Sequence, residues 1–325
     1  PITYTATHGA NNNIVPANTT YTWTIKTDNA FITGKSAQAT AQPSISQTLT
    51  NTSNTTQLIV YEVTPRSGIS GNCIGAPFNV TITVSPRPSI QDETIAVCSN
   101  APVTYTATHG TNNNIVPANT TYTWTIKTDN ASITGKSAQA TAQTSFTQTL
   151  RNTSNTQQTI VYTLTPISGN CTGTPFDLTV QVNPTPEIAA ETIAVCSNVP
   201  ITYTATHGAN NNIVPANTTY TWTIKTNNTF ITGKSAQPTA QTSFTQTLRN
   251  TSNTQQTIVY TLTPRSGNCA GTPFDLTVQV NPTPEIAADA ATICSGDAFN
   301  ITPTQGVNNN IVPANTTYTW TIKTD

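Results

Sequence analysis

Hydrophobic and polar residues alternate over short stretches of the chain, and turn-forming residues separate these stretches. Within 121–126, Tyr122, Trp124 and Ile126 alternate with threonines. Successive side chains of a strand point to opposite faces, so this pattern predicts a strand with one buried and one solvated face. The same pattern, with an imperfection at Gln148, predicts further strands in this part of the chain at 94–98, 103–108, 133–135, 146–150, 160–164 and 176–182. No stretch has helical periodicity.

The sequence repeats itself with a period of close to one hundred residues. The segment Asn-Ile-Val-Pro-Ala-Asn-Thr-Thr-Tyr-Thr-Trp-Thr-Ile-Lys-Thr occurs four times, and its tryptophan falls at Trp23, Trp124, Trp222 and Trp320. The first step is longer because of extra residues near Gly68-Ile69-Ser70, just before Cys73. An insertion that the fold tolerates predicts a surface loop at this place.

A Pro-x-Pro triplet separates neighbouring repeats and favours a stiff, extended link. The triplets divide the chain into four units: 1–85, which lacks its beginning, 86–183, 184–281, and 282–325, which lacks its end.

Each complete unit is expected to fold as an immunoglobulin-like β-sandwich. About seven short strands separated by turn residues within one unit are typical of this all-β fold. The four tryptophans are the largest residues on the predicted inward faces, so we expect all of them to be core residues. The chain is therefore predicted to be a tandem array of sandwiches, in which neighbouring repeats are each other's partners.

The composition excludes some classes of partner. Charged residues make up 8% of the chain, and 12 Lys and Arg stand against 13 Asp and Glu. No basic face is available to neutralise phosphates, so nucleic acid is not an expected partner. No apolar run approaches the length of a membrane span.

Several motifs together resemble the PKD-like and Ig-like repeats of Bacteroidetes surface proteins. They are Val-Cys-Ser-Asn, Tyr-Thr-Trp-Thr-Ile, Gly-Asn-Cys-Thr-Gly-Thr-Pro and Val-Gln-Val-Asn-Pro-Thr-Pro. The similarity is closest to the giant gliding-motility adhesins of the SprB type. The chain departs from standard PKD domains after Trp124, where Thr125-Ile126-Lys127-Thr128 replaces an acidic Gly-Asp segment.

The resemblance implies a location and a role. Proteins of this kind are exported by type IX secretion, anchored at the outer membrane and moved along the cell surface. The expected partners are then the outer-membrane gliding and secretion machinery, contacted through regions outside this sequence.

The cysteines recur at fixed places and predict structural disulfides in an oxidising compartment. The candidates in the complete units are Cys98, Cys171, Cys196 and Cys269. Pairing within a repeat, Cys98 with Cys171 and Cys196 with Cys269, is the simplest interpretation. In ordinary immunoglobulin wiring, however, the A–B and F–G turns lie at opposite ends of a sandwich, which favours a staple between domains from Cys98 to Cys269. Sequential pairing, such as Cys73 with Cys98, is a third possibility.

No residue pattern predicts catalysis, a bound cofactor or a metal centre. The histidine shared by three repeats, His109 in the second, is Gln305 in the fourth, which a required base or ligand would not tolerate. The acids are scattered, and a linker acid such as Glu187 is too isolated for a calcium site. We therefore expect that the protein is not an enzyme.

The most distinctive predicted loop is Asn-Asn-Asn-Ile-Val-Pro-Ala-Asn, which contains Asn112, Asn113 and Asn114. These side chains are candidates for weak contacts with surface polysaccharide, multiplied along the array. The simpler interpretation is a loop in which asparagine tolerates left-handed turns.

Three functions remain open from the sequence. The leading hypothesis is the stalk of a secreted cell-surface adhesin, which holds an adhesive tip away from the outer membrane. The alternatives are a polysaccharide-binding repeat module and an accessory region of a secreted enzyme.

Overall fold

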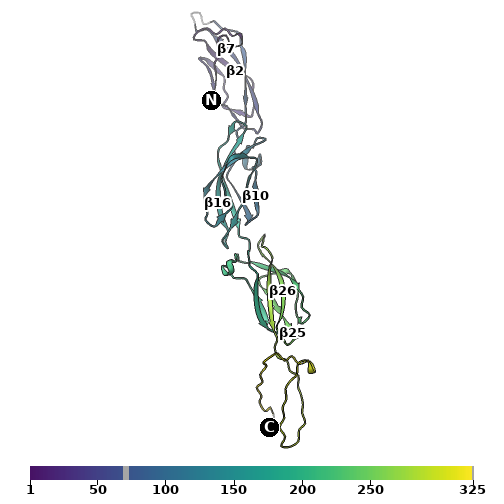
Figure 1. Cartoon of the computed structure of the whole chain (residues 1–325). Coiled ribbons are helices and arrows are strands. Elements are labelled where there is room, and N and C mark those ends of the chain that lie inside the picture. Colours follow the sequence, from purple (N-terminus) through teal and green to yellow (C-terminus); the bar gives the residue numbers. More distant parts are fainter. Residues whose placement is uncertain (69–72, 324–325) are drawn as a thin grey trace.

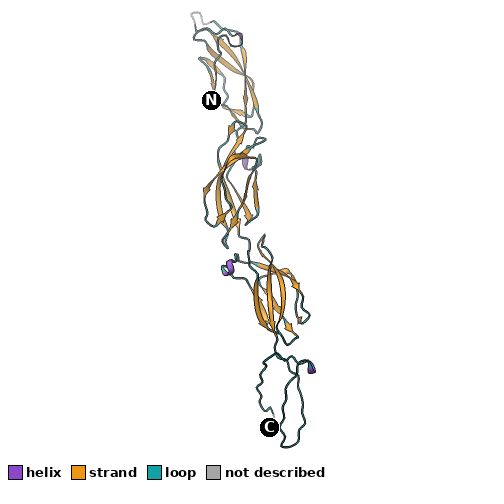
Figure 2. Cartoon of the chain, in the orientation of Figure 1, coloured by secondary structure: helices purple, strands orange, loops and turns teal. Residues whose placement is uncertain are grey.

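The computed structural model describes residues 1–68 and 73–323 of the chain. In this part, three β domains follow one another end to end, and a segment without strands follows them (Figure 1). Apart from four 3-10 turns of three residues each, all regular structure is strand (Figure 2). The predicted all-β fold class of tandem sandwiches is confirmed. The insertion predicted near Gly68 falls mostly on 69–72, outside the described residues.

The middle domain shows the complete architecture. Its strands are β9 (Glu93–Cys98), β10 (Pro102–Tyr105), β11 (Thr121–Thr128), β12 (Ile133–Thr134), β13 (Gln139–Gln143), β14 (Phe146–Thr149), β15 (Arg151–Asn152), β16 (Gln158–Ser168), β17 (Cys171–Thr172) and β18 (Phe176–Asn183), and its 3-10 turn is η2 (Thr111–Asn113).

The larger sheet of this domain has the order β13-β11-β16-β18-β9, and β17 pairs with β16. The pairs β10–β14 and β12–β15 form the opposite layer. All of these pairs are antiparallel except β9 with β18, which run parallel. The sequence pattern did not predict β13, β15 and β17. Two of these, β15 and β17, have two residues each, and β13 (Gln-Ala-Thr-Ala-Gln) has no buried residue to create a hydrophobic period.

Alternation explains the core of the middle domain. Tyr122 and Trp124 on β11 and Tyr162 on β16 are at most 4% exposed. The edge of the Trp124 ring packs against Phe146, with ring centroids 5.1 Å apart. Burial of each such side chain contributes about 1.5–3 kcal/mol to folding. The Trp124 indole N–H is also satisfied, because it donates to the Ser137 carbonyl at 3.1 Å.

Gln148 interrupts the hydrophobic pattern of β14 for a structural reason. It is 8% exposed, and its side-chain oxygen accepts the Ser137 N–H at 3.0 Å while its amide donates to the Ser137 carbonyl at 3.2 Å. A buried polar group with its bonds satisfied is tolerated in a core. Gln148 therefore fastens the loop over Trp124.

The first and third domains repeat this arrangement. The first contains β1 (Ile2–Tyr4), η1 (Ala10–Asn12), β2 (Thr20–Thr27), β3 (Ile32–Thr33), β4 (Gln38–Gln42), β5 (Ile45–Gln47), β6 (Thr50–Asn51), β7 (Gln57–Arg66) and β8 (Phe78–Val84). The third contains β19 (Glu191–Cys196), β20 (Pro200–Tyr203), η3 (Ala209–Asn211), β21 (Thr219–Thr226), β22 (Ile231–Thr232), β23 (Gln237–Gln241), β24 (Phe244–Thr247), β25 (Arg249–Asn250), β26 (Gln256–Ser266), β27 (Cys269–Ala270) and β28 (Phe274–Asn281).

Residues 282–323 contain the turn η4 (Val307–Asn309) and one isolated bridge, between Glu285 and Ile311, but no strand. The prediction that Trp320 is a core residue is wrong, because its side chain is 87% exposed. Trp23, Trp124 and Trp222 are 3–4% exposed. Trp320 differs because residues 282–323 form no strands and therefore no opposite layer over its ring.

The core of the middle domain contains one unpaired hydroxyl that yields a test. The Tyr162 hydroxyl is buried without a hydrogen-bond partner, whereas the Tyr122 hydroxyl accepts the Ala107 N–H at 3.3 Å. Tyr162→Phe should leave stability unchanged or raise it by up to about 1 kcal/mol, and Tyr122→Phe should lower it by about 1 kcal/mol. Hydrogen exchange of the β11 and β16 peptides measures both. A Tyr162→Phe protein less stable than Tyr122→Phe would contradict this account of the core.

Candidate functional site

The parallel pairing of β9 with β18 decides which end of a domain each cysteine occupies. Cys98 lies opposite Asn183 in this ladder, where the chain leaves the middle domain. Cys171 lies at the other end, near the linker through which the chain arrives. There Gly173 approaches Pro88 so closely that a β-carbon on Gly173 would lie 2.2 Å from the Pro88 carbonyl oxygen. The two cysteines of one repeat are therefore at opposite ends of the domain.

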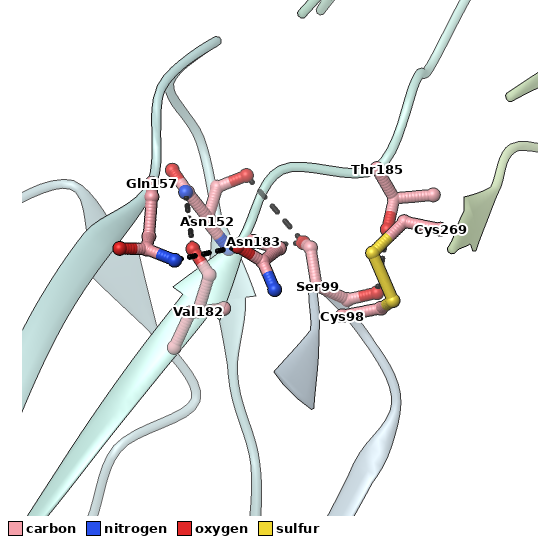
Figure 3. Close-up of a disulfide and its surroundings, with 8 residues drawn as sticks. All are labelled: Cys98, Ser99, Asn152, Gln157, Val182, Asn183, Thr185 and Cys269. Atoms are coloured by element: carbon pink, nitrogen blue, oxygen red, sulfur yellow. Dashed lines mark hydrogen bonds between the residues drawn. A yellow bond between two sulfur atoms is a disulfide. The ribbon is translucent and has the colours of Figure 1, made fainter. Parts of the chain in front are cut away.

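Cys98 forms a disulfide with Cys269 of the next domain, with 5.5 Å between the Cα atoms (Figure 3). The interpretation in which Cys98 pairs with Cys171 and Cys196 with Cys269 is wrong, and so is the pairing of Cys73 with Cys98. The physical reason is distance, because a disulfide needs Cα atoms within about 7 Å and a sandwich is several times longer. Cys73, Cys171, Cys196 and Cys294 are free.

Non-covalent contacts surround this staple. Glu187, from the linker, receives two hydrogen bonds from the Arg151 guanidinium, at 2.5 and 3.2 Å. The Asn100 amide donates to the same carboxylate at 3.2 Å. Paired, planar contacts of this kind fix direction as well as distance. The linker acid thus binds an arginine of the preceding domain, a contact that the sequence analysis did not predict.

Beneath the junction lies a buried polar centre, Asn152, which is 0% exposed. Its amide donates to the Val182 carbonyl at 2.8 Å, and its backbone N–H donates to the Ser99 hydroxyl at 3.0 Å (Figure 3). The amide also donates to the Thr156 carbonyl at 2.7 Å. Asn152 therefore ties the end of β18 to the residue that follows Cys98. This network holds Cys98 and the start of the linker in one place.

The linker continues as part of the next domain. Glu187 and Ile213 exchange two backbone hydrogen bonds, at 2.8 and 3.0 Å, and the Ala189 N–H donates to the Asn212 side chain at 2.8 Å. On the other side, the Thr185 hydroxyl donates to the Ser99 carbonyl at 3.2 Å. Both domains hold the linker, so it does not act as a free hinge.

The three asparagines proposed for polysaccharide contact differ in their exposure to solvent. Asn114 is 2% exposed, and its side chain accepts the Gln91 N–H at 2.9 Å, so it is a structural residue. Asn112 and Asn113 are exposed and take left-handed conformations, with φ of 51° and 60°. The turn geometry expected for asparagine is therefore present. In the third domain the equivalents Asn210 and Asn211 line an open groove of about 720 Å³ beside the staple.

The recurrent histidine has a structural partner. His109 accepts the Val116 N–H at Nδ1, at 3.3 Å, and Gln305 accepts the equivalent Val312 N–H at 2.7 Å. Glutamine replaces histidine because both offer a side-chain acceptor at this place. The histidine thus shapes the asparagine loop.

Several of the other acids pair with a base or a hydroxyl. Hydrogen bonding to Lys127 lowers the pKa of Asp177, and hydrogen bonding to Lys136 lowers that of Asp129. The Tyr105 hydroxyl donates to Glu93 at 2.9 Å, and burial together with this bond raises the pKa of Tyr105. Over the described ranges, no group of three or more His, Cys, Asp or Glu residues is placed to hold a metal ion. No helix within these same ranges is long and apolar enough to cross a membrane.

The junction after the third domain repeats the non-covalent contacts. Arg249 donates to Glu285 at 2.5 and 3.2 Å, and the Asn198 amide donates to it at 3.3 Å. The junction after the first domain differs, because Thr50 stands in the place of the arginine and Ser89 in the place of the glutamate. The backbone bridge from Ser89 to Ile115 and the bond from the Gln91 N–H to the Asn114 side chain are retained there.

The comparison with protein families identifies the class. The PKD-like domain family matches residues 5–88, 95–186 and 193–284. The chain therefore belongs to the PKD-like domain family and contains three such domains in tandem. A comparison with curated proteins gave no match.

Solved structures with tandem β-sandwich repeats resemble the chain only distantly. The human desmocollin-1 ectodomain is 12% identical with a TM-score of 0.24, and the match covers 85% of this chain and 57% of that one. The EC22-24 segment of mouse cadherin-23 is 11% identical with a TM-score of 0.25, covering 82% and 87%. The FN1-FN3 domains of chicken CNTN1 are 10% identical with a TM-score of 0.29, covering 82% and 90%.

The disulfide connectivity can be tested directly. Digestion of the non-reduced protein should release one cross-linked pair, in which the peptide containing Cys98 is joined to the peptide containing Cys269. The two are distinguishable, because Cys98 precedes Ser-Asn-Ala-Pro and Cys269 precedes Ala-Gly-Thr-Pro. A pair joining Cys98 to Cys171 would overturn the arrangement of the junction.

Acid should loosen the junction at Glu285. Hydrogen bonding to Arg249 holds the pKa of Glu285 below its ordinary value of 4.5. A carboxylate with a depressed folded-state pKa contributes stability above its unfolded pKa and loses it as pH falls through the folded value. Exchange protection of the Ile311 N–H, which donates to the Glu285 carbonyl, should therefore fall a few-fold below about pH 4.5. Glu285→Gln should remove this pH dependence; protection that still falls equally in that variant would contradict the mechanism.

Proposed function

We propose that this chain is part of the stalk of a large secreted cell-surface adhesin, which spaces an adhesive tip from the outer membrane. Tandem PKD-like domains in a line, each a closed sandwich, give a long and thin body. The resemblance to gliding-motility adhesins supports a role in surface attachment and gliding, with export by type IX secretion. A disulfide supports an extracellular location, because such bonds persist in oxidising compartments.

The observation that carries the proposal is the staple from Cys98 to Cys269, which joins the end of one domain to the start of the next. In the loop-entropy model, closing a loop of this length contributes about 5 kcal/mol. The Arg151–Glu187 ion pair and the hydrogen bonds from the linker to both domains fix the orientation of the two domains around this covalent link. A covalent link between domains resists extension, which a rod under tension requires and which catalysis or transient binding does not.

The staple also determines how tension crosses the two domains. Force entering through the linker at Pro88 passes along β9 to Cys98, through the disulfide to Cys269, and along β28 to the next linker. Residues 99 to 268 form a loop that the disulfide closes, and the pulling force does not pass through the backbone of this loop. The middle and third domains are thus protected from unfolding by pulling, and the stalk keeps its length.

The proposal includes no enzymatic activity and no cofactor. Most of the acids pair with lysines, arginines or tyrosines, and the histidines accept backbone hydrogen bonds. The expected partners are neighbouring repeats and, through regions outside this sequence, the outer-membrane gliding and secretion machinery.

Polysaccharide binding is the second candidate. Exposed Asn210 and Asn211 line the groove beside the staple, together with Arg151 and Glu187. We favour the stalk because the left-handed turns account for these asparagines without a ligand, and because Glu187 and Arg151 already satisfy each other.

Stretching single molecules by their ends tests the stalk proposal. The staple spans 171 residues of sequence, which at about 3.4 Å per residue corresponds to roughly 580 Å of contour length. In the oxidised chain this contour length should not be released at forces that unfold ordinary sandwiches. Reduction, or the Cys98→Ser variant, should release it in further unfolding steps.

The first domain provides an internal control, because no disulfide joins it to its neighbour within the described residues. Its unfolding should release about 290 Å, the length of roughly 85 residues, equally before and after reduction. Oxidised chains that extend to the same final length as reduced ones would contradict a load-bearing role for the staple.

A further inference from the structure

Two of the free cysteines occupy the same positions as the two that are bonded. Cys196 ends β19 opposite Asn281, as Cys98 ends β9 opposite Asn183. Cys171 lies in the β16–β17 hairpin, as Cys269 lies in the β26–β27 hairpin. Cys196 is therefore equivalent to Cys98, and Cys171 is equivalent to Cys269. Cys98 and Cys269 form the disulfide between the middle and third domains.

The surface around Cys196 already holds the contacts that accompany the complete staple. Glu285 binds Arg249 and Asn198, and the Thr283 hydroxyl donates to the Ser197 carbonyl at 3.2 Å, as Thr185 donates to Ser99. The linker after the third domain is thus docked in the same way. Cys196 itself is exposed beside these contacts and available for reaction.

We propose that Cys196 is the disulfide site for the hairpin cysteine of a complete repeat that follows the third domain. By the same geometry, Cys171 is the site for the cysteine that ends the first strand of the preceding repeat. The partner in both cases is a domain of this same type, recognised by the carboxylate on arginine and by the linker threonine. In forming the bond, two thiols lose two protons and two electrons, and a small disulfide such as oxidised glutathione is reduced to two thiols.

Pairing among Cys73, Cys171 and Cys196 does not satisfy them. Cys171 lies at the upstream end of the middle domain and Cys196 at the downstream end of the third, with the lengths of two sandwiches between them. Cys73 belongs to the upstream end of the first domain, one sandwich further from Cys171. Distances of this size exclude a bond, because a disulfide requires Cα atoms within about 7 Å.

Staples at every junction would create two covalent lines through the array. One line already runs from β9 through the existing staple to β28. The other would run along β18, through the linker to β19, and through Cys196 to the next domain. In each domain the two lines would lie side by side, because β9 pairs with β18 and β19 with β28 in parallel. This mechanical consequence rests on the proposed stalk function, whereas the pairing itself does not.

The test extends the full chain with its own sequence. A copy of residues 130–183 is added after Asp325 and completes the fourth repeat. This copy contains a second Cys171 in an identical peptide, so Cys171→Ser in the middle domain lets peptide mapping identify the added cysteine. After refolding with reduced and oxidised glutathione, peptide mapping should join Cys196 to the added cysteine and retain Cys98 with Cys269. Alkylation of Cys196 should be almost completely lost relative to the unextended chain.

Two further measurements make the result decisive. Trp320, 87% exposed now, should become buried in the extended chain and shift its fluorescence to shorter wavelength. In a Cys196→Ser version the added cysteine should remain alkylatable while Trp320 is still buried. An added cysteine that stays free, one that pairs with Cys294, or a Trp320 that stays exposed would each overturn the proposal. None of these outcomes depends on whether the protein is a stalk, which the stretching experiment tests separately.

Discussion

The parallel pairing of the first and last strands in the middle and third sandwiches is the constraint on which the whole arrangement depends. Because β9 runs alongside β18 in the same direction, the chain arrives at one end of the domain and leaves at the other. Domains joined in this way must form a line. The same pairing carries Cys98 to the downstream end, beyond the reach of Cys171 and next to the hairpin of the following domain. The shape of the array and the connectivity of the staple are therefore two consequences of one strand direction.

The junction combines interactions that are individually modest. Arg151 and Glu187 are 44% and 32% exposed, and an ion pair so open to water contributes little to stability. Its two parallel hydrogen bonds nevertheless select one orientation of the linker, which the buried amide of Asn152 holds from below. The disulfide then makes this orientation permanent. If the joint serves direction rather than affinity, this explains why Arg151 and Glu187 bind each other.

The features that the sequence predicted and those that it did not differ in range. Alternation around Trp124 acts between neighbours in one strand, so the pattern identified the fold class and the main strands. The bond Cys98–Cys269 was one of three pairings open from the sequence, and the structure confirms it. The pair Arg151–Glu187 joins residues that only the assembled fold brings together, and no local period reveals it. Asn152 was missed for a different reason, because a buried asparagine looks like a turn residue in sequence. The predicted burial of Trp320 failed because a tryptophan on an inward face is buried only when the opposite layer is present.

Differences between the copies show that at two places the members of a charged pair change together. Where the first junction has Thr50 in place of Arg151, it also has Ser89 in place of Glu187, so both partners are replaced together. On the sheet surface, Lys127 pairs with Asp177 of β18, whereas its counterpart Lys26 pairs with Glu62 of β7 and has Asn79 where the aspartate would be. The acidic residue lies on the neighbouring strand in the first domain, but the lysine forms an ion pair in both domains. At these two places pairing weakens the local field of the charges, while Thr, Asn and Gln keep the surrounding surface hydrated. At the junction and on the sheet surface alike, pairing therefore leaves little unbalanced charge where the two partners meet.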